Sequence, residues 1–382
     1  MIAAQRTLLM AGAGFATLLF AAIIMDSATR GLLFAIGLAM GVSLYHGAFG
    51  FSGAYRKLLN ERDMTGVAAQ IVMLIAAIIL FAPILAQGSV FGHEVSGSVA
   101  PLGVAVGFGA FIFGIGMQLG SGCASGILYT TGGGNVRTLL VLFFFCLGAF
   151  WGSLDLGWWQ QLPSMSGVSL GQTLGWEIAA PLQIGVLVLI LAGLHLSGWT
   201  MQPISRWRDG LSLTSLLKGP WPLIVSAVAL ALLNWATLLV AGHAWSITWA
   251  FTLWGAKAAV LLGWDPATSD FWTGGFQQAA LGRSILSDTT SIMNIAILLG
   301  ALLAAAMAGA FYKALPQGPR PLIAAVIAGL MMGYGARLAY GCNIGAFFSG
   351  VASSSLHGWL WILCALPGNA LGIALRRPFH LT

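Results

Sequence analysis

Residues 114–126 read GIGMQLGSGCASG, and residues 333–345 read GYGARLAYGCNIG with the same spacing of glycine and cysteine. In each copy a long apolar run breaks into a glycine-rich loop that carries a cysteine, Cys123 in the first and Cys342 in the second. Lipid cannot hydrogen-bond free peptide groups, so irregular backbone at membrane depth persists only where protein covers it or where it lines a polar cavity. Two such interrupted spans in corresponding halves of a chain are typical of a transporter site.

The composition indicates an all-α polytopic membrane protein. Of the 382 residues, 58% are apolar and only 7% are charged, and long apolar runs recur along the whole chain. At about 20 residues per crossing, a chain of this length has room for roughly nine to ten transmembrane helices. The net charge of +6 is spread over short loops instead of forming a patch, which favours a role in topology and excludes nucleic acid as the expected partner.

The apolar runs predict the order of the spans. Candidate spans cover residues 7–25, 31–45, 66–86, 99–118, 136–152, 178–197, 222–241, 289–312, 321–338 and 356–375. The run at residues 247–262 is too short to cross and contains a lysine, so it is predicted to be a re-entrant half-helix. A polar, basic stretch at 205–220 is the expected cytoplasmic linker between an N-terminal repeat, 1–204, and a C-terminal repeat, 221–382.

The positions of Lys and Arg predict which side each loop occupies. If the N-terminus is cytoplasmic, most basic residues fall on the cytoplasmic side: Arg56, Lys57, Arg62, Arg137, Arg206, Arg208, Lys218, Lys313, Arg320, Arg376 and Arg377. Residues 93–98 and 153–177 fall outside and contain neither Lys nor Arg, whereas Arg30 and Arg283 break the pattern. We therefore expect a multi-pass protein of the bacterial inner membrane, surrounded by lipid, with both termini in the cytoplasm. The Cys123 loop then enters from the cytoplasmic side and the Cys342 loop from the outside, as an inverted repeat.

Four cysteines are present, and two of them lie in the interrupted spans. They form no CxxC pair and no cluster with metal-ligand spacing, so we expect no metal site, no disulfide framework and no cofactor. Cys146 and Cys364 lie in plain apolar runs and are interpreted as packing residues. The same reading applies to Cys123 and Cys342, but their repeated position between glycines favours a function. A thiol is a weak donor and a soft contact, suited to a sulfur-bearing anion.

Four longer polar side chains are candidates for the substrate pathway. Gln118 and Arg337 lie five residues before each cysteine. Each of the two side chains either caps a loop carbonyl, reaches the membrane interface, or takes part in transport. In the last case, Arg337 would neutralise a passing oxyanion. Lys257 either reaches water from its half-helix or attracts anions. His46 closes a third glycine-rich break, residues 41–53, where it is either an interfacial residue or a site of proton coupling.

Small residues of the cysteine loops complete the candidate pathway. Their hydroxyl, amide and backbone groups can donate hydrogen bonds to anionic oxygens. These residues are Ser121, Gly122, Ser125, Gly341 and Asn343. No Walker loop and no nucleotide fingerprint occurs, so the sequence does not predict an ATP-driven engine.

At these motifs the chain resembles the YeeE/YedE family of sulfur-transport membrane proteins. The likeness lies in GVSLYHGAFGFSGAYR at residues 41–56, GIGMQLGSGCASG at 114–126, ITWAFTLWGAK at 247–257, GYGARLAYGCNIGAFFSG at 333–350 and SLHGW at 355–359. The resemblance implies an inverted-repeat bundle of about nine spans with short re-entrant helices. It also implies a route along which thiosulfate passes between cysteine thiols through S–H···S contacts, and it assigns those thiols to Cys123 and Cys342.

The chain departs from the thiosulfate branch of that family in its first broken helix. That branch has a third cysteine there, with an arginine four residues before it. Alignment of GFSGAYR places Gly50 at the position of the cysteine and His46 at that of the arginine.

Two functions follow from these observations, and a non-transporting scaffold within a larger complex is the third possibility. The first is a permease, not an enzyme, for a small sulfur-containing anion, either thiosulfate or a related sulfur or selenium compound. The alternative is a membrane sulfur-relay enzyme or subunit, in which a cysteine carries a persulfide to a cytosolic sulfur carrier protein. A relay contact needs only the weak bond of a thiol, whereas a carrier needs a reactive thiolate.

Overall fold

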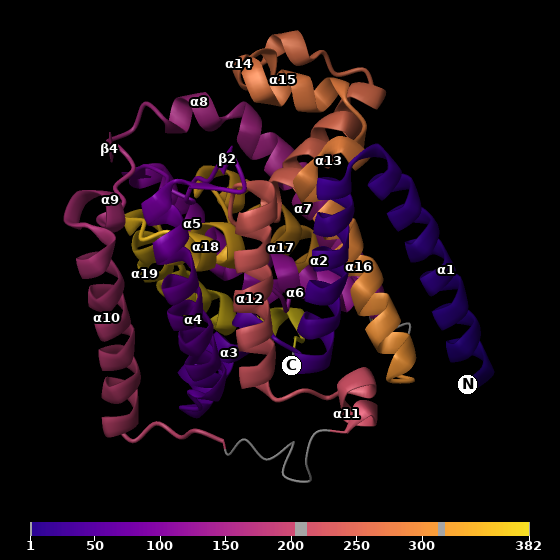
Figure 1. Cartoon of the computed structure of the whole chain (residues 1–382), viewed down its shortest axis with the longest axis horizontal. Helices are drawn as coiled ribbons and strands as arrows, with labels where there is room; N and C mark the ends of the chain where they lie inside the picture. Colours follow the sequence, from indigo (N-terminus) through magenta and orange to yellow (C-terminus); the bar gives the residue numbers. More distant parts are fainter. Residues whose placement is uncertain (1, 203–211, 312–317, 382) are drawn as a thin grey trace.

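The computed structural model describes residues 2–202, 212–311 and 318–381, which are almost entirely helical (Figure 1). Ten helical segments are long and apolar enough to cross a membrane, which agrees with the expected all-α polytopic class. The elements that cross or enter the bundle are α1 (Ile2–Asp26), α2 (Ala28–Gly47), α3 (Phe51–Glu61), α4 (Thr65–Gln87), α5 (Val104–Leu119), α6 (Ala124–Gly132), α7 (Val136–Leu154), α10 (Trp176–Leu196), α12 (Leu223–Ala241), α13 (Thr248–Leu261), α16 (Thr289–Met307), α17 (Pro319–Leu338), the π-helix η3 (Asn343–Phe348), α18 (Ser349–Ala352) and α19 (Leu356–Ala374).

Short elements cover the two ends of the bundle. They are α8 (Leu156–Trp159), α9 (Leu170–Leu174), α11 (Leu213–Lys218), α14 (Asp270–Thr273) and α15 (Gly275–Gly282), with the 3-10 turns η1 (Pro266–Thr268), η2 (Ile285–Ser287) and η4 (Arg377–Phe379). Two antiparallel ribbons join β1 (Ser89–Val90) to β2 (His93–Glu94) and β3 (Leu102–Gly103) to β4 (Ser164–Met165). Arg206, Arg208, Lys313 and residues 205–211 of the expected linker lie outside the described residues.

The bundle has two ends, which we call the N side, where α1 begins, and the far side. Figure 1 shows the N- and C-termini and α11 at the bottom of the view, and α8, α14 and α15 at the top. On the N side, Gln5 donates to the Phe311 carbonyl at 2.8 Å, and Arg137 donates to the Pro321 carbonyl at 3.2 Å. On the far side, Gln160 donates to the Tyr340 hydroxyl at 3.2 Å. Arg137 and Arg376, two of the basic residues expected in the cytoplasm, lie on the N side, and the orientation of that side in the cell stays a prediction.

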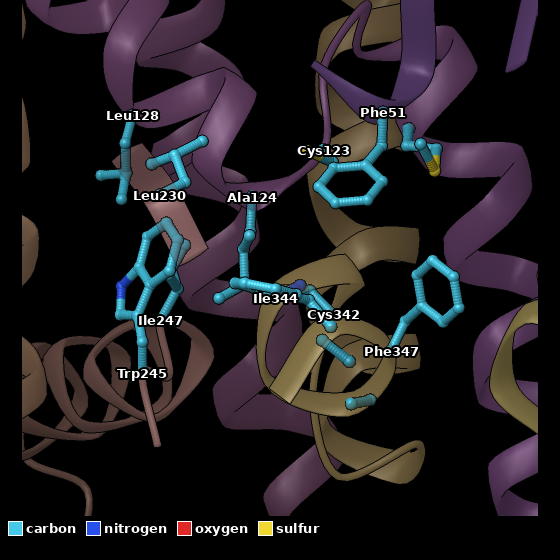
Figure 2. Packing of buried hydrophobic residues seen from close by; sticks show 14 of the residues in the cluster. Phe51, Cys123, Ala124, Leu128, Leu230, Trp245, Ile247, Cys342, Ile344 and Phe347 are labelled. Carbon is cyan, nitrogen blue, oxygen red and sulfur yellow. The ribbon is translucent and has the colours of Figure 1, made fainter. Parts of the chain in front are cut away.

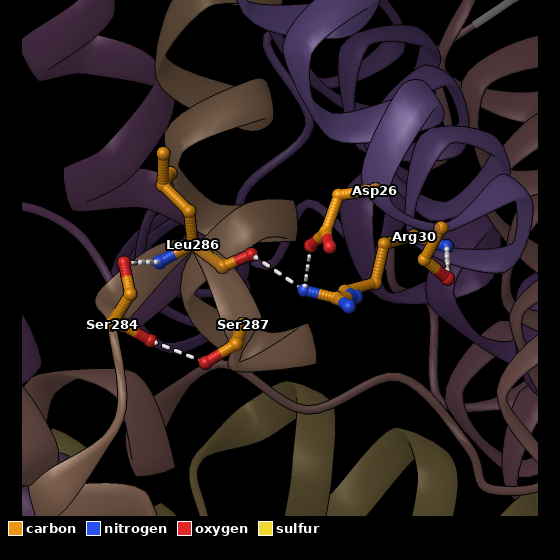
Figure 3. Close-up of polar contacts among 6 residues, drawn as sticks. Asp26, Arg30, Ser284, Leu286 and Ser287 are labelled. Carbon is orange, nitrogen blue, oxygen red and sulfur yellow. Dashed lines mark hydrogen bonds and ion pairs between the residues drawn. The ribbon is translucent and has the colours of Figure 1, made fainter.

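Arg30, an exception to the charge pattern, is tied down locally on the far side. Its guanidinium pairs with Asp26 at 2.7 Å, one helical turn away, and donates to the Leu286 carbonyl at 3.4 Å (Figure 3). Ser27 begins α2 by accepting a hydrogen bond from the Arg30 amide. The arginine therefore joins the α1–α2 turn to the segment before α16, which accounts for a basic residue on this side.

Helix packing pairs the two halves of the chain. Helix α16 packs on α2 and α4 packs on α12; α17 packs on α7 and α5 packs on α19. Contacts between α2 and α12, and between α5 and α17, join the halves at the centre. The first-half helices α2, α4, α5 and α7 correspond in this order to α12, α16, α17 and α19 of the second half. With this correspondence, the contact of α2 with α16 is repeated as that of α12 with α4, and the contact of α7 with α17 as that of α19 with α5. Helix α10 lies against α4 as α1 lies against α16, so it takes the place of α1 in this correspondence.

The glycines that open each motif serve this packing. Gly114 and Gly333 lie inside α5 and α17, where a Cβ atom would collide with the Ala365 carbonyl of α19 and the Phe145 carbonyl of α7, respectively. Gly116 and Gly335 bring α5 and α17 together in the same way, because added Cβ atoms would lie 2.8 Å from Met332 and 2.5 Å from the Gly109 carbonyl. The interruption is therefore shorter than the glycine-rich motif, and small residues allow close helix contact as in other membrane bundles.

Candidate functional site

The two interruptions share one backbone geometry. The amide of Gly122 donates to the Met117 carbonyl at 3.0 Å, and that of Gly341 donates to the Ala336 carbonyl at 2.9 Å. The residues before them, Ser121 and Tyr340, both adopt the left-handed conformation, with φ of 61° and 55°. Gly341 itself has φ of 152°, a value that favours glycine. The aligned motifs thus fold into equivalent breaks at the ends of α5 and α17.

Each cysteine begins the short helix that follows its break. Cys123 is the N-cap residue of α6 and Cys342 that of η3, both with extended backbone, and both side chains are buried. The Cys123 sulfur lies 3.3 Å from the Ser125 hydroxyl, and the Cys342 sulfur accepts from the Ile344 amide at 3.4 Å. Neither thiol is exposed to solvent, so a small molecule reaches them only by passing through the protein interior.

Both thiols belong to one hydrophobic core at the centre of the bundle. That core also contains Phe51 at the start of α3 and Phe347 of η3, whose ring centroids are 6.3 Å apart (Figure 2). The helices that begin at the two cysteines, α6 and η3, contact each other. The tertiary structure therefore places in one core two thiols that are separated by more than half the sequence.

Two polar side chains near the thiols face each other but form no hydrogen bond of normal geometry among the described residues. They are Asn343, with both its amide nitrogen and its oxygen, and the hydroxyl of Tyr55. Both residues are buried, and Tyr55 lies near Cys123 and Asn343. A buried polar group without a partner is costly, and such groups mark places where a ligand can supply the missing bonds. Tyr55 was not among the candidates from sequence, although it lies in the motif at residues 41–56.

The two breaks open toward opposite ends of the bundle. Ser121 accepts hydrogen bonds at 3.2 Å from Arg137 and from Arg376, both on the N side. Tyr340 instead meets Gln160 on the far side. At the end of the Cys342 helix, the Ser353 hydroxyl accepts from the Ser98 amide at 2.9 Å, again on the far side. One interruption thus enters from each end.

Gln118, a pathway candidate, is held by protein groups on the N side. Its amide nitrogen donates to the Ser52 carbonyl at 3.0 Å and to the Asn369 side-chain oxygen at 2.7 Å. Arg376 donates to the Gln118 carbonyl at 2.6 Å and Arg137 to the Leu119 carbonyl, as expected for cations at a helix C-terminus. Burial lowers the pKa of Arg376 to about 10, and the positive charges of Arg56 and Arg137 act in the same direction.

Arg337, the counterpart of Gln118, lies beside open space on the far side. Its guanidinium carbon is 5.2 Å from the centre of the Phe271 ring, and its Nε atom has no partner among the described residues. The side chain lines a cavity of about 260 Å³ together with Tyr340 and residues of α13 and α15. At the same position of the motif, Gln118 is therefore hydrogen-bonded to neighbouring protein groups in one half, whereas Arg337 borders a cavity in the other.

The remaining candidates lie apart from the thiols. Lys257 donates to the carbonyls of Leu281 and Arg283 at 2.7 and 2.6 Å, which ties α13 to the end of α15. His46 ends α2 on the N side; its carbonyl accepts from the Trp221 amide at 2.8 Å and its ring lies 5.5 Å from that indole. These contacts give both residues a structural role.

Gly50 occupies a site that faces the first thiol's surroundings. It is the N-cap residue of α3, with an extended backbone that any residue can adopt. A Cβ atom at Gly50 would lie 3.6 Å from the hydroxyl of Tyr129, a residue of α6 near Cys123. A side chain at this position would therefore point toward the Cys123 helix.

No group of three or more His, Cys, Asp or Glu side chains suited to a metal ion occurs among the described residues. The site consists of two buried thiols, unpartnered amide and phenol groups between them, and arginines near both ends. Weak, soft contacts at the centre with positive charge at the ends can pass a small anion.

Comparison with known proteins finds a matching family model and several relatives. The family model described as sulphur transport matches residues 46–371. A thiosulfate transporter, TsuA, of Spirochaeta thermophila is 30% identical over 343 residues, which cover 87% of this chain and 95% of the relative. The Escherichia coli TsuA is 24% identical over 341 residues, covering 87% of this chain and 90% of its own. A protein named probable transporter YedE from Escherichia coli is 31% identical over 152 residues, 40% of this chain and 37% of its own.

Proposed function

The chain belongs to the sulphur-transport family, and from this premise we propose that it carries a small sulfur-containing anion across a membrane, using Cys123 and Cys342 as successive contacts. Thiosulfate is the first candidate substrate, because two relatives that align with 87% of the chain are named as its transporters. A related sulfur or selenium anion fits the same contacts.

The observation that carries this proposal is the burial, in one core of the bundle, of two thiols from equivalent breaks whose following helices contact each other. A hydrated anion does not cross such an apolar region, so it must shed water and find substitutes for the lost hydrogen bonds. The Asn343 amide and the Tyr55 hydroxyl are available as such substitutes. Thiols add weak S–H donors, which bind an anion loosely enough for it to leave again.

Arginines lie near both ends of the proposed route. Arg137 and Arg376 lie beside Ser121 at the N-side break, and Arg337 lies at the far-side break. Positive charge at a channel mouth raises the local concentration of anions. Loop charge favours a cytoplasmic N side, and the proposed transport then runs inward from the far side.

Uptake of labelled thiosulfate by cells that lack other sulfur importers tests the proposal. We expect Cys123→Ala and Cys342→Ala to lower uptake by about tenfold or more, because each removes one contact in the dry centre. Cys146→Ala and Cys364→Ala are the matched controls, since these cysteines lie within α7 and α19 outside the breaks. Equal uptake by all four folded variants would reject the thiols as contacts, and no uptake by wild type would reject thiosulfate.

The relay alternative predicts a different result at the same cysteines. An enzyme that hands sulfur to a cytosolic carrier must hold a covalent persulfide on Cys123 or Cys342. The transporter proposed here forms no such bond. Alkylation and mass spectrometry after incubation with thiosulfate should find both cysteines unmodified by sulfur, and a trapped persulfide would favour the enzyme.

A further inference from the structure

A cavity on the far side separates Arg337 from the surface. It is about 260 Å³ in volume and lies between the start of α13, the end of α17 and the α14–α15 pair. Its lining residues are Ser246, Thr248, Trp249, Thr252, Phe271, Phe276, Gln277, Ala336, Arg337 and Tyr340. The volume suits one small polyatomic ion with a few water molecules.

The lining carries a positive charge and no carboxylate among the described residues. The nearby acid Asp288 is already engaged, because it accepts from the Trp249 indole at 3.0 Å and from the Ser291 amide at 2.8 Å. The Phe271 ring faces the Arg337 guanidinium, and the Nε atom of that guanidinium is unpartnered among the described residues. A half-buried cation without a carboxylate beside it is stabilised by an anion.

Neutral donors from three elements face the same space. Thr248 lies on the first turn of α13, Gln277 belongs to α15, and Tyr340 follows α17. The Thr252 hydroxyl also lines the space, but it donates to the Thr248 carbonyl at 3.1 Å. Hydroxyl and amide groups around an arginine provide directed hydrogen bonds for an oxyanion, in addition to charge. The cavity is therefore polar where it adjoins Arg337.

The cavity adjoins the element that carries the second thiol. Ser246 lines the cavity, and its hydroxyl lies 3.3 Å from where a Cβ of Gly345 would be. Gly345 belongs to η3, the helix that Cys342 begins. Arg337, at the other wall, lies five residues before Cys342. An ion in the cavity is thus one helix wall away from the proposed pathway.

The segment that covers the cavity, which includes α14 and α15, has no counterpart in the first half of the chain. Helices α13 and α16 are separated by residues 262–288, which include α14 and α15, whereas the equivalent α3 and α4 are separated by residues 62–64 alone. Figure 1 shows α14 and α15 above the bundle, beyond α13. Trp272 anchors this insertion by donating to the Ser153 hydroxyl at 2.9 Å.

We propose that this cavity is a capture site for a small oxyanion of sulfur, in which Arg337 supplies the charge, Gln277 and the Thr248 hydroxyl of α13 supply hydrogen bonds, and the α14–α15 insertion forms the outer wall. Its role in transport rests on the proposed function. Anion binding to the cavity is a separate property that can be measured without transport.

Calorimetric titration of the purified full-length protein with thiosulfate and with sulfate, in neutral detergent, tests the site. Arg337→Gln removes the charge, and we expect thiosulfate affinity to fall about tenfold to a hundredfold, the value of a charged hydrogen-bonded contact. Arg337→Lys should retain part of the affinity. Arg283→Gln is the control, since this exposed arginine lies on the same side, outside the cavity lining.

A second pair of variants tests the site even if the Arg337 variants fail to fold. Gln277→Glu places a negative charge in the cavity and should weaken thiosulfate binding about tenfold, whereas Gln278→Glu adds the same charge to an exposed neighbour and should change it less than about twofold. Equal affinity in the two variants would overturn the capture site, as would unchanged affinity in Arg337→Gln or a wild-type protein that binds neither anion.

Uptake assays separate this site from the proposed function. We expect Arg337→Gln to raise the KM for thiosulfate about tenfold while the maximal rate changes less than about twofold, because capture precedes passage. Normal uptake with intact binding in every cavity variant rejects the capture site and leaves transport standing. Cavity binding in a wild-type protein that transports no sulfur anion rejects the proposed function and leaves the binding site standing.

Discussion

The two breaks share one turn geometry but differ in the conformation of the glycine before the cysteine and in their surroundings. At the N-side break, the Gln118 amide nitrogen donates to Ser52 and Asn369, while its side-chain oxygen has no partner among the described residues, and two arginines cap the carbonyls that end α5. At the far-side break the equivalent residue, Arg337, borders a cavity under an insertion. A repeated motif therefore conserves the position of the thiol while the neighbouring contacts differ. The difference suggests one end built for stability and one for capture.

Replacement of the glycine before each cysteine tests how alike the backbones of the two breaks are. Among the variants considered, it should lower the free energy of unfolding most. Gly341→Ala is strained at φ of 152°, and its Cβ would lie 2.6 Å from the Ala346 amide. We expect the free energy of unfolding to fall by about 3 kcal/mol. The Cβ in Gly122→Ala would lie 3.2 Å from the Ile127 amide, and the expected loss there is about 1 kcal/mol.

Thermal unfolding of the two glycine variants in detergent, monitored by circular dichroism, measures this order. Expression and monodispersity of each protein serve as controls for misfolding during synthesis. A larger loss in Gly122→Ala than in Gly341→Ala would contradict the backbone difference between the breaks.

Substitution of Gln118 and Arg337, the equivalent polar residues of the two motifs, tests whether the first stabilises the fold and the second binds the anion. Gln118→Ala leaves the Asn369 oxygen and the Ser52 carbonyl without their donor in a buried place, so the free energy of unfolding should fall by about 1–3 kcal/mol. Arg337→Gln removes a side chain whose Nε bonds no described residue, and stability should change by less than about 1 kcal/mol. The measurement is chemical or thermal unfolding of both proteins in one detergent.

The comparison fails if both polar variants lose equal stability. In that case Arg337 would be a structural residue like Gln118, and the cavity beside it would have no special role. A stable Arg337 variant with weakened thiosulfate binding would instead sharpen the distinction between the ends.

A third thiol in the first broken helix should have the smallest effect on stability. Gly50 has extended backbone, and an added Cβ would make ordinary contact with the Tyr129 hydroxyl, so Gly50→Cys should change the free energy of unfolding by less than about 0.5 kcal/mol. If thiols are the contacts for the substrate, uptake of thiosulfate should rise, because a third thiol would face the Cys123 helix. Gly50→Ser is the matched control, and equal uptake by the two variants would argue against a specific role of sulfur there.

Much of the fold was predictable because lipid imposes simple rules on sequence. Long apolar runs mark the crossings, and the short run at residues 247–262 became α13, a helix of 14 residues. The paired motifs located both breaks. Glycine was harder to interpret, because it signals either an irregular turn or a close helix contact. Gly114 and Gly333 proved to lie inside helices, and only packing against α19 and α7 distinguishes the two uses.

The candidate site was predictable in its thiols and less so in its polar groups. Repetition singled out Cys123 and Cys342, but nothing local distinguishes Tyr55 from other tyrosines. Lys257 attracted attention as a charge in an apolar half-helix, yet its ammonium meets two carbonyls of the α15–η2 segment. Such partners lie in other elements, so spacing along the chain does not reveal them.

The sequence by itself determined the membrane class, the order of the spans and the two equivalent breaks, since hydropathy and glycine act through local chain properties. The tertiary structure decided which thiols are buried in one core, which polar side chains are left without partners and which motif residue borders a cavity. Gln118 illustrates the reason: its partner Asn369 is 251 residues away in the chain, and only packing of α5 against α19 brings the two amides together.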